Sequence, residues 1–565
     1  MPRLDRRHQD VLQEADEDDK DSITFIFERS VMAHSPSFHG NTSSKDVSRY
    51  SSRVLGTWGV VAIIFLYGCG GSMGSGSIIY GGGPLIGLIA IAVYPLVMTV
   101  PYGYIIAELC SAFPHDGGFA LWVMHAFGPF WGFQVGYWSW LAGVLTCALV
   151  PDLLLKIILY CVDYKIESQL VTYLIKAAMA LALALPSLSG TKFTSRVCMF
   201  FLVIVLLPLV VFTIWSFAET ESSVVDFSQI RRDFTNATID GSSDVTTLGE
   251  VNINWSVLIN TLAWKYGGLN MASLFAGEVK DPSRVFPRAI TITIVLSLLV
   301  VLLPLLAAIA THRLAWTSFD ILGMFILVSR KIGGTFLFVL ILTSETSTTA
   351  GRFISSIAAH RMPWTEFDDP GMFIRVGGEL GGTFLFAILI ASSVSTAAGR
   401  FISCLYCTSF QISGMAENDL VPEFLANKNN AFRTPQYAVI CTLLTILPLQ
   451  LLGHDQMLSV CNAFAGAVEL LILCAAVKLR LKMPYIPRPV KMPGGIVMLV
   501  LSALGPATVV VYIVYDSLIS HNGAYMGLAA LAAGVFYGLY DLWDRRRTAD
   551  AFATAGSGVV ITPAH

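Results

Sequence analysis

The sequence has few charged residues, and this shortage is its first informative property. Only 13% of the 565 residues are Asp, Glu, Lys or Arg, whereas a soluble domain carries about 25%. Apolar residues make up 55%, and the few charges lie in the first fifty residues, the loops and the tail. Apolar runs of about 20 residues remain between them. The composition excludes a soluble globular protein and predicts an all-α integral membrane protein that crosses the lipid bilayer many times.

The ten cysteines show neither the paired spacing of a disulfide framework nor a metal-binding pattern. Several lie inside apolar runs, among them Cys147, Cys404 and Cys461, and we interpret them as small buried hydrophobic residues. No nucleophile–base pair or cluster of metal ligands stands out. These absences argue against an enzyme, a metal site or a cofactor, and no nucleic-acid partner is expected.

Twelve apolar segments are long enough to be membrane-spanning helices. They are predicted at residues 54–80, 84–108, 131–160, 170–189, 195–217, 253–277, 289–310, 381–413, 436–452, 458–478, 494–519 and 524–543. The polar N-terminus contains no run that resembles a cleavable signal peptide, so we expect a disordered cytosolic tail there. The predicted order is a tail at 1–50, helices 1–7 at 51–311, an insert at 312–359, helices 8–10 at 360–478, helices 11–12 at 479–544 and a cytosolic tail at 545–565.

Basic residues orient these segments. Lys and Arg gather on alternate loops, at 192–196, 280–288, 428–433 and 478–491, and again after the last segment at 545–547. Cytosolic loops carry an excess of Lys and Arg, so these loops and both termini are predicted to be cytosolic. The loop at 219–252 then lies outside, where Asn236-Ala237-Thr238 fits a glycosylation acceptor. The expected location is the plasma membrane.

The first apolar segment contains Gly74, Ser75 and Gly76, with more glycines on both sides. Irregular backbone is tolerated inside a membrane only where it is buried in protein or lines a polar cavity. Small residues here would leave main-chain N–H groups exposed to a ligand. The alternative is a close helix–helix contact between small residues. The density of glycine favours a binding site.

The sixth apolar segment has a similar interruption, in the sequence from Trp264 to Asn270, which includes Gly267 and Gly268. It follows the first interruption by five segments. An inverted repeat of five helices would produce this spacing, and such repeats place the substrate at mid-membrane between two discontinuous helices. The predicted fold is therefore a 5+5 inverted repeat with broken helices 1 and 6, followed by two C-terminal helices.

Motifs in and between these segments resemble the amino acid–polyamine–organocation transporter superfamily. The first are Met73–Gly76, Trp264 and Ala276–Pro282. Others are similar to eukaryotic polyamine and L-type amino acid uptake carriers, known from plants and trypanosomatid protozoa: Ala107-Glu108-Leu109, Phe113-Pro114, Gly117-Gly118, Trp122, Ala126-Phe127-Gly128, Gly132-Phe133-Gln134, Trp140–Gly143, Ser413–Glu417, Leu420-Val421-Pro422 and Arg433-Thr434-Pro435. The resemblance covers residues 54–490.

The resemblance implies a permease that works by alternating access, with proton coupling usual among relatives. N–H groups at Ser75 and Gly76 would hold a substrate carboxylate, and carbonyl groups near Trp264 and Gly267 would take an amino group. Trp264 would close over the substrate, although it could instead be an interfacial anchor. The remaining pocket candidates are Gly74, Lys265, Tyr266, Asn270, Arg400, Cys404 and, from the third segment, Tyr137 or Thr146.

Several positions depart from the pattern of polyamine carriers. Those carriers have acidic residues in segments 3 and 6, where this sequence has Thr146-Cys147 and Asn270. It also adds cations, Lys265 after the gating Trp and Arg400 in segment 8. Buried cations repel a dication, so neutral or acidic amino acids become the more plausible substrates. Alternatively, Lys265 pairs with Glu278 or Asp152, and Arg400 caps carbonyl groups. Glu278 is also the candidate for ion coupling, unless it anchors nearby cations.

Residues 312–355 repeat as 360–403, with 26 identities in 44 aligned positions at an offset of 48. Inverted fold repeats diverge much further, so this is a tandem duplication. The second copy continues into the family pattern. The first copy is predicted to be external, re-entrant or paired as two crossings, because one extra crossing would invert every later loop. An erroneous gene model or an inactivating duplication are the other possibilities.

Two other classes of function are weighed against a transporter. A channel would need pore-lining rings from symmetric subunits, whereas this chain has two unlike broken helices in one polypeptide. A transport-inactive amino acid sensor would keep the same pocket and stays as the alternative. An unusually long signalling tail would favour the sensor, but the N-terminal tail has only about fifty residues.

Overall fold

The computed structural model describes residues 53–71, 75–162, 166, 168–218, 232–233, 250–310, 383–429, 434–452, 454–484, 486–519, 527, 531–540 and 543. Within these ranges the chain is helical apart from turns and one short β-ladder. The predicted tails, the insert at 312–359, and Gly74 lie outside the described residues, so the predictions about them stay predictions.

The α-helices have the following bounds in chain order: α4 (Thr57–Tyr67), α5 (Gly76–Tyr94), α6 (Val100–Ala112), α7 (Phe119–Phe127), α8 (Pro129–Val162), α9 (Gln169–Leu188), α10 (Thr191–Ala218), α11 (Trp255–Tyr266), α12 (Pro282–Ala310), α17 (Thr383–Ala416), α18 (Gln436–Leu449), α19 (His454–Lys482) and α20 (Gly495–Ile519). Short 3-10 or π-helical elements join some of them: η1 (Pro95–Thr99), η2 (Leu269–Leu274), η3 (Ala276–Glu278) and η5 (Glu423–Ala426). Strands β1 (Arg232–Asp233) and β2 (Glu250–Val251) form an antiparallel pair.

Seven described helical segments are long and apolar enough to cross a membrane: Gly76–Ala112, Pro129–Leu159, Gln169–Leu188, Thr191–Ala218, Pro282–Ala310, Val460–Lys482 and Gly495–Ser517. Shorter apolar helices are Thr57–Tyr67, Gln436–Leu449 and Leu531–Tyr540. The prediction of an all-helical membrane protein is confirmed. The count of twelve spans and the inverted repeat stay predictions.

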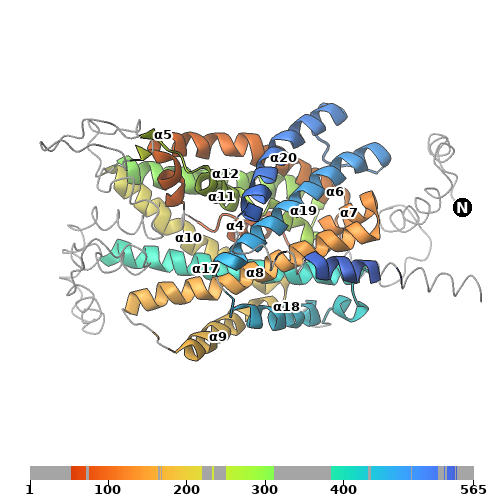
Figure 1. Ribbon diagram of the computed structural model, residues 1–565, viewed down its shortest axis with the longest axis horizontal. Coiled ribbons are helices and arrows are strands. Elements are labelled where there is room, and N and C mark those ends of the chain that lie inside the picture. The colour runs from red at the N-terminus through yellow and green to blue at the C-terminus, as the bar shows by residue number, and fades with distance from the viewer. Residues whose placement is uncertain are drawn as a thin grey trace, which may run out of the picture.

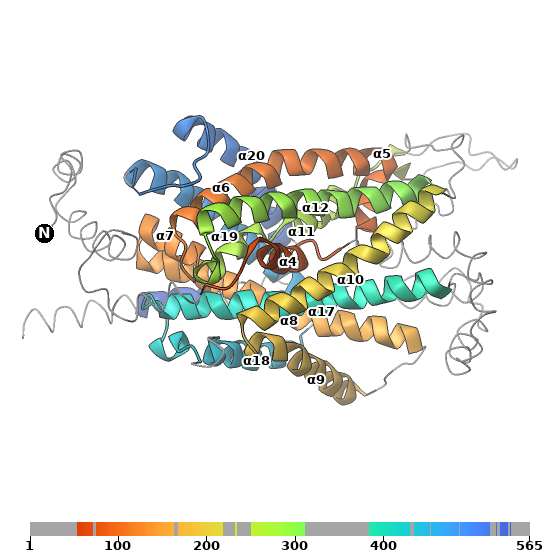
Figure 2. The same cartoon turned by 180° about the vertical axis from the view of Figure 1, so that it is seen from behind.

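The long helices run roughly parallel to the longest axis of the molecule (Figure 1). Helix α17 packs against both α8 and α10, and α19 packs against α8 and α20. Seen from behind, the short helix α4 lies near the centre of the bundle, and it contacts α10, α12 and α17 (Figure 2). Its residues from Gly59 to Leu66 are all buried. Helix α4 is thus an apolar central element whose backbone ends inside the protein.

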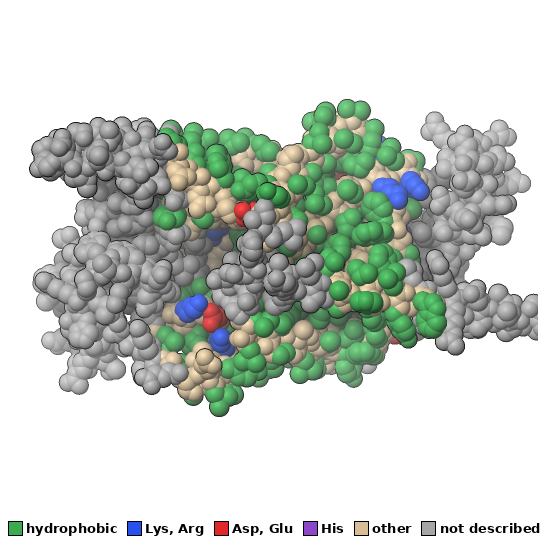
Figure 3. Space-filling view, viewed as in Figure 1, with side chains coloured by type: hydrophobic (Ala, Val, Ile, Leu, Met, Phe, Trp, Pro, Cys, Tyr) green, Lys and Arg blue, Asp and Glu red, His purple; other side chains and the backbone are tan. Residues whose placement is uncertain are grey.

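Hydrophobic side chains cover most of the described surface on the face shown in Figure 3, and charged side chains are few. Helices α9 and α10 illustrate the pattern, because Leu174, Leu181, Phe200 and Leu207 are all exposed. An apolar exterior of this size is expected of a protein whose solvent is lipid rather than water. The surface therefore agrees with the composition.

Candidate functional site

The first helix is interrupted after Tyr67. Helix α4 ends at Tyr67, Gly70 and Gly71 have φ angles of +63° and +119°, and α5 begins at Gly76. Residues with a side chain rarely adopt such positive φ angles, which explains the glycines. The break starts at Gly68, six residues before the predicted interruption at 74–76.

Ser75 immediately precedes α5 and is completely buried, and Gly76 is buried with it. The first N–H groups of a helix have no partner within the helix and form its positive end. At this buried helix start, those donors and the helix dipole suit an anionic group such as a carboxylate. Ser75 and Gly76 therefore lie at a buried helix start, and their binding of a carboxylate stays a prediction.

The sixth segment is interrupted where the sequence predicted. Helix α11 ends at Tyr266, Gly267 is extended, and Gly268 has a φ of +83°. The chain then continues as the 3-10 turns η2 and η3 instead of an α-helix. A side-chain Cβ on Gly268 would lie 2.8 Å from Tyr67 Cδ1 and 3.3 Å from Gly68 Cα. The two interruptions are therefore in direct contact, and we call this region the double break.

Lys265 joins the two halves of the double break. Its side chain is 6% exposed, and Nζ donates hydrogen bonds to the carbonyl oxygens of Gly71 at 2.9 Å and Cys69 at 3.4 Å. These carbonyl groups have left the α4 helix, so they need donors. Of the alternative partners suggested for Lys265, Asp152 binds Lys156 at 3.0 Å and Lys176 at 3.2 Å.

Trp264 lies between two helices that are distant in sequence. Its Nε1 donates a hydrogen bond of 2.9 Å to Asn462 Oδ1 on α19. The guanidinium carbon of Arg400, on α17, lies 4.3 Å from the centre of its ring, which is a cation–π contact. Both partners lie within the helix bundle, so the alternative of an interfacial anchor is not supported.

Arg400 lies beside the first interruption as well. Thr396, one turn earlier on α17, is the nearest side chain to Gly70, because a Cβ added to Gly70 would lie 3.1 Å from Thr396 Cγ2. The Arg400 Nε is buried and has no hydrogen-bond partner among the described residues, which also include no carboxylate within ion-pair distance of its guanidinium group. The structure does not support the alternative in which Arg400 caps carbonyl groups through this atom.

Two predicted pocket residues take part in helix packing. Cys404 is completely buried and its Sγ donates to the carbonyl oxygen of Gly143 at 3.3 Å. Thr146 Oγ1 lies 3.2 Å from Cys461 Sγ and donates to the carbonyl oxygen of Ala142 at 2.8 Å. These side chains connect α8 with α17 and α19, and Cys404 lies one helical turn after Arg400 on α17.

The structure does not bring Tyr137 to the double break. Its ring stacks on Phe133 at 6.0 Å and lies against Gly534, in a separate apolar cluster with Met415. Glu278 also lies apart, at the end of η3, where its carbonyl oxygen accepts from the N–H groups of Val54 and Leu55 at 2.9 Å. Its proposed part in ion coupling stays a prediction.

Tyr266 and Asn270 lie on either side of the interruption at Gly267 and Gly268. Asn270 is 2% exposed, and its Oδ1 has no hydrogen-bond partner among the described residues. Tyr266 donates to the carbonyl oxygen of Ile91 at 3.2 Å and stacks on Tyr94 with ring centres 5.7 Å apart. Asn270 thus offers an open acceptor, and Tyr266 connects the site to α5.

Sequence reasoning missed Asn462 and Glu469, both on α19. Asn462 accepts a hydrogen bond from Trp264, and Glu469 lies seven residues further on, in the span Val460–Lys482. The signal for Glu469 was present, because an ionisable residue inside an apolar segment is a functional candidate by default. Asn462 carried no comparable signal, since its partner comes from a helix 198 residues away.

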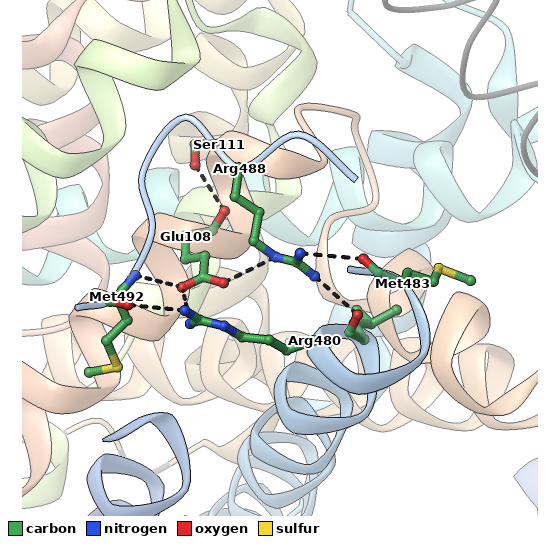
Figure 4. Close-up of polar contacts among 7 residues, drawn as sticks. Glu108, Ser111, Arg480, Met483, Arg488 and Met492 are labelled. Atoms are coloured by element: carbon green, nitrogen blue, oxygen red, sulfur yellow. Dashed lines mark hydrogen bonds and ion pairs between the residues drawn. The ribbon is translucent and has the colours of Figure 1, made fainter. Parts of the chain in front are cut away.

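Away from the double break, one end of the bundle is held together by ion pairs. Glu108 accepts from Arg480 at 2.9 Å, from Arg488 at 3.1 Å and from the N–H group of Met492 at 2.9 Å (Figure 4). Arg480 also donates to the carbonyl oxygen of Met492 at 3.0 Å. The carboxylate therefore fastens α6 to the link between α19 and α20.

A second ion-pair cluster lies on the turns between helices. Asp116 binds Lys428 and accepts from the N–H group of Gly277 at 2.9 Å, and Glu417 lies 3.3 Å from the same Lys428. Burial alone would lower the pKa of Lys428, but the carboxylates of Asp116, Glu417 and Glu278 outweigh it and raise that pKa above its usual value. We call this cluster and that of Glu108 together the ion-paired end.

No group of three or more His, Cys, Asp or Glu side chains among the described residues could hold a metal ion. The chemistry available at the double break is therefore that of helix ends, freed carbonyl groups, two cations and an indole ring. Such groups can bind and release a small charged molecule.

Comparison with known proteins agrees with this description. A family profile described as amino acid permease matches residues 55–533. Polyamine transporter RMV1 of Arabidopsis thaliana is 26% identical over 482 residues, which cover 84% of this chain and 83% of the relative. Polyamine transporter PUT1 of Oryza sativa subsp. japonica is 24% identical over 491 residues, covering 86% and 78%. A probable polyamine transporter of Arabidopsis thaliana is 27% identical over 481 residues, covering 81% of each chain.

Proposed function

Because the chain belongs to the amino acid permease family, we propose that it is a secondary active transporter that carries amino acids across a membrane by alternating access. The double break is the substrate site. Substrate would bind where α4, α5, α11 and η2 end or begin, since the main-chain groups freed there can satisfy a charged solute in a medium without water.

The observation that carries the choice of substrate is the pair of cations around Trp264. The Lys265 ammonium group already occupies the carbonyl oxygens of Cys69 and Gly71, and the Arg400 guanidinium group covers the indole ring. A polyamine would bring further positive charge into this low-dielectric region, which is unfavourable. A carboxylate is attracted by both cations and by the start of α5 at Ser75 and Gly76.

The named relatives are polyamine transporters, so polyamine transport is the competing function. An acceptor for an ammonium group does remain at the double break, because Asn270 Oδ1 is buried without a hydrogen-bond partner among the described residues. One such neutral acceptor suits the single amino group of an amino acid. Two or more ammonium groups would need more.

Uptake into proteoliposomes distinguishes these functions. Purified protein would be tested by counterflow with a labelled panel of neutral, acidic and basic amino acids, spermidine and putrescine. We expect exchange of a neutral or acidic amino acid and little competition from either polyamine. High-affinity spermidine exchange with no amino acid exchange would overturn the choice of substrate. Binding of a panel member without any exchange would instead identify the transport-inactive sensor.

Alternating access would use the proton gradient as its driving force, and the plasma membrane is the expected location, with both termini in the cytosol. The basic loops support this orientation through the positive-inside rule. Accessibility of a tag at either terminus to a membrane-impermeant reagent in intact cells tests the orientation directly. Labelling of either tag from outside would contradict it.

A further inference from the structure

Glu469 is a carboxyl group near the middle of a membrane-spanning segment. The span runs from Val460 to Lys482, so Glu469 lies two residues from its midpoint at 471. Its side chain is only partly buried, and none of the described residues forms a hydrogen bond or an ion pair with it. A carboxylate at this depth is costly unless it has a partner or binds a proton.

Two tyrosine hydroxyl groups share this part of the interior. Tyr94 and Tyr102, from α5 and α6, are 8% and 2% exposed and interact electrostatically with Glu469. Neither hydroxyl group has a hydrogen-bond partner among the described residues. Buried polar groups normally have partners, so the two open hydroxyl groups and the Glu469 carboxyl group point to a small ligand such as a proton with bound water.

Among the described residues, no Lys, Arg or His forms an ion pair with Glu469. On the helices packed against α19, His125 of α7 binds the carbonyl oxygen of Leu121, Glu108 of α6 binds Arg480 and Arg488, and Asp516 of α20 accepts from Ser256 and Asn260. Lys478, further along α19, lies 4.2 Å from the centre of the Phe127 ring. Helix α8 places Trp138 against Phe464, one turn before Glu469. A proton can therefore neutralise Glu469 without displacing a described ion-pair partner.

Two structural paths connect Glu469 with the double break. Asn462 and Glu469 are seven residues apart, which is two helical turns, so they lie on the same face of α19 about 10 Å apart. Asn462 binds Trp264. On the other path, Tyr94 stacks on Tyr266, the last residue of α11 and the neighbour of Lys265.

From these contacts we propose that Glu469 is the site where the transporter binds and releases its coupling proton, and that Asn462 and Tyr94 relate this protonation to the state of the double break. The proton adds to a carboxylate oxygen from the solution on one side and leaves to the solution on the other. No other bond changes. The proposal deepens the proposed function and rests on it.

The test uses Glu469→Gln in the full-length protein, reconstituted in proteoliposomes. Counterflow measures exchange without a driving force, and accumulation under an imposed inward proton gradient measures coupling. We expect Glu469→Gln to retain exchange but to lose at least tenfold of the gradient-driven accumulation, and Glu469→Asp to recover part of it. Asp516→Asn, a carboxyl of α20 whose partners are hydrogen-bond donors, is the matched control and should keep its response to the gradient.

Accumulation by Glu469→Gln equal to that of the wild type would overturn the proposal. Wild-type exchange with no response to a proton gradient would overturn it too, while the proposed function would stand. If the wild type exchanges no panel member, the proposed function fails, and infrared spectroscopy still tests the site. A protonated carboxyl band that titrates in the wild type and is missing in Glu469→Asp or Glu469→Gln supports a proton site, and its absence from the wild type overturns it.

If Glu469→Gln does not fold, Tyr94→Phe is a second test variant. It removes the hydroxyl group and keeps the ring that stacks on Tyr266. A hydroxyl group beside a carboxylate favours its charged form. Removing it should raise the pH of half-maximal gradient-driven uptake, whereas Tyr537→Phe, whose ring contacts Phe133 at 4.9 Å, should leave that pH unchanged. An unchanged pH profile in Tyr94→Phe would break the link between Glu469 and the double break.

Discussion

The ion-paired end and the double break handle buried charge in opposite ways. At the ion-paired end three carboxylates have cations within 3.3 Å: Glu108 has Arg480 and Arg488, and Asp116 and Glu417 share Lys428. At the double break, Lys265 binds carbonyl oxygens and Arg400 lies over the ring of Trp264. On α19, Glu469 lies two helical turns from Asn462.

This difference separates structure from function. A carboxylate between two guanidinium groups has little to gain from any further ligand, so it holds helices together. Lys265, Arg400 and Glu469 do not pair with each other, so in a low dielectric they can bind a substrate or a proton. The ion-paired end is therefore expected to matter for folding, and the double break for transport. The following predictions test that division.

The largest effect is expected from Glu108→Gln. The neutral amide would leave two arginines and the Met492 N–H group with a single uncharged acceptor oxygen, and breaking a buried pair costs about 3–5 kcal/mol. Folded protein in detergent should decrease strongly, as measured by size-exclusion chromatography and denaturant titration. Glu423→Gln, at an exposed position of η5, is the control and should unfold like the wild type. A stable Glu108→Gln variant with altered transport would contradict the division.

Gly76→Leu should give the complementary result. The side chain would enter the buried start of α5, where the carboxylate is expected, and uptake should fall by about a hundredfold, since small misplacements in a site have effects of that order. Surface expression should be retained. Gly56→Leu is the control, because a Cβ at Gly56 meets no atom within 4 Å. Normal uptake by Gly76→Leu would remove Ser75 and Gly76 from the site.

The sequence predicted the double break because glycine affects the backbone locally. Gly70, Gly71 and Gly268 have positive φ angles, and no distant contact is needed to see that such residues weaken a helix. The partners of Lys265 and Trp264 could not be predicted in the same way. Lys265 binds carbonyl groups 194 and 196 residues away, and any residue type supplies a carbonyl group.

Residues Tyr137 and Thr146 show a second limit of the sequence. Both lie on α8, nine residues apart, which is about 13 Å along a helix. Which part of such a long helix faces the site depends on the elements that pack against it. Thr146 packs against Cys461 of α19, whereas Tyr137 packs in the Phe133 cluster. The family resemblance indicated that α8 contributes to the site, but not which of its residues face the double break.

Lys265→Asn tests the substrate preference expected at the double break. Removing the ammonium group frees the carbonyl oxygens of Cys69 and Gly71 and reduces attraction for a carboxylate, which should weaken amino acid uptake about tenfold. Competition by putrescine and spermidine should rise. Lys265→Arg keeps the charge and serves as the control. Strong polyamine uptake by the wild type, unaltered in Lys265→Asn, would show that the relatives' substrate applies here.

The smallest effect concerns His125, on α7, whose ring stacks on Phe113. Burial lowers the pKa of its ring, although the hydrogen bond of 2.7 Å with the carbonyl oxygen of Leu121 opposes the shift. The unfolded chain then binds more protons than the folded protein. The contribution to stability is complete above the unfolded pKa of about 6.5 and is lost as the pH falls below it.

The melting temperature in detergent should therefore fall between pH 7 and pH 5 more in the wild type than in His125→Phe, which keeps an aromatic ring against Phe113 but cannot titrate. The comparison of slopes removes the contribution of carboxylates such as Glu108 and Asp116, since they are the same in both proteins. Equal slopes would mean that the His125 ring is charged or hydrated in the folded state. The described ion pairs would then no longer account for all the charge at that end of the molecule.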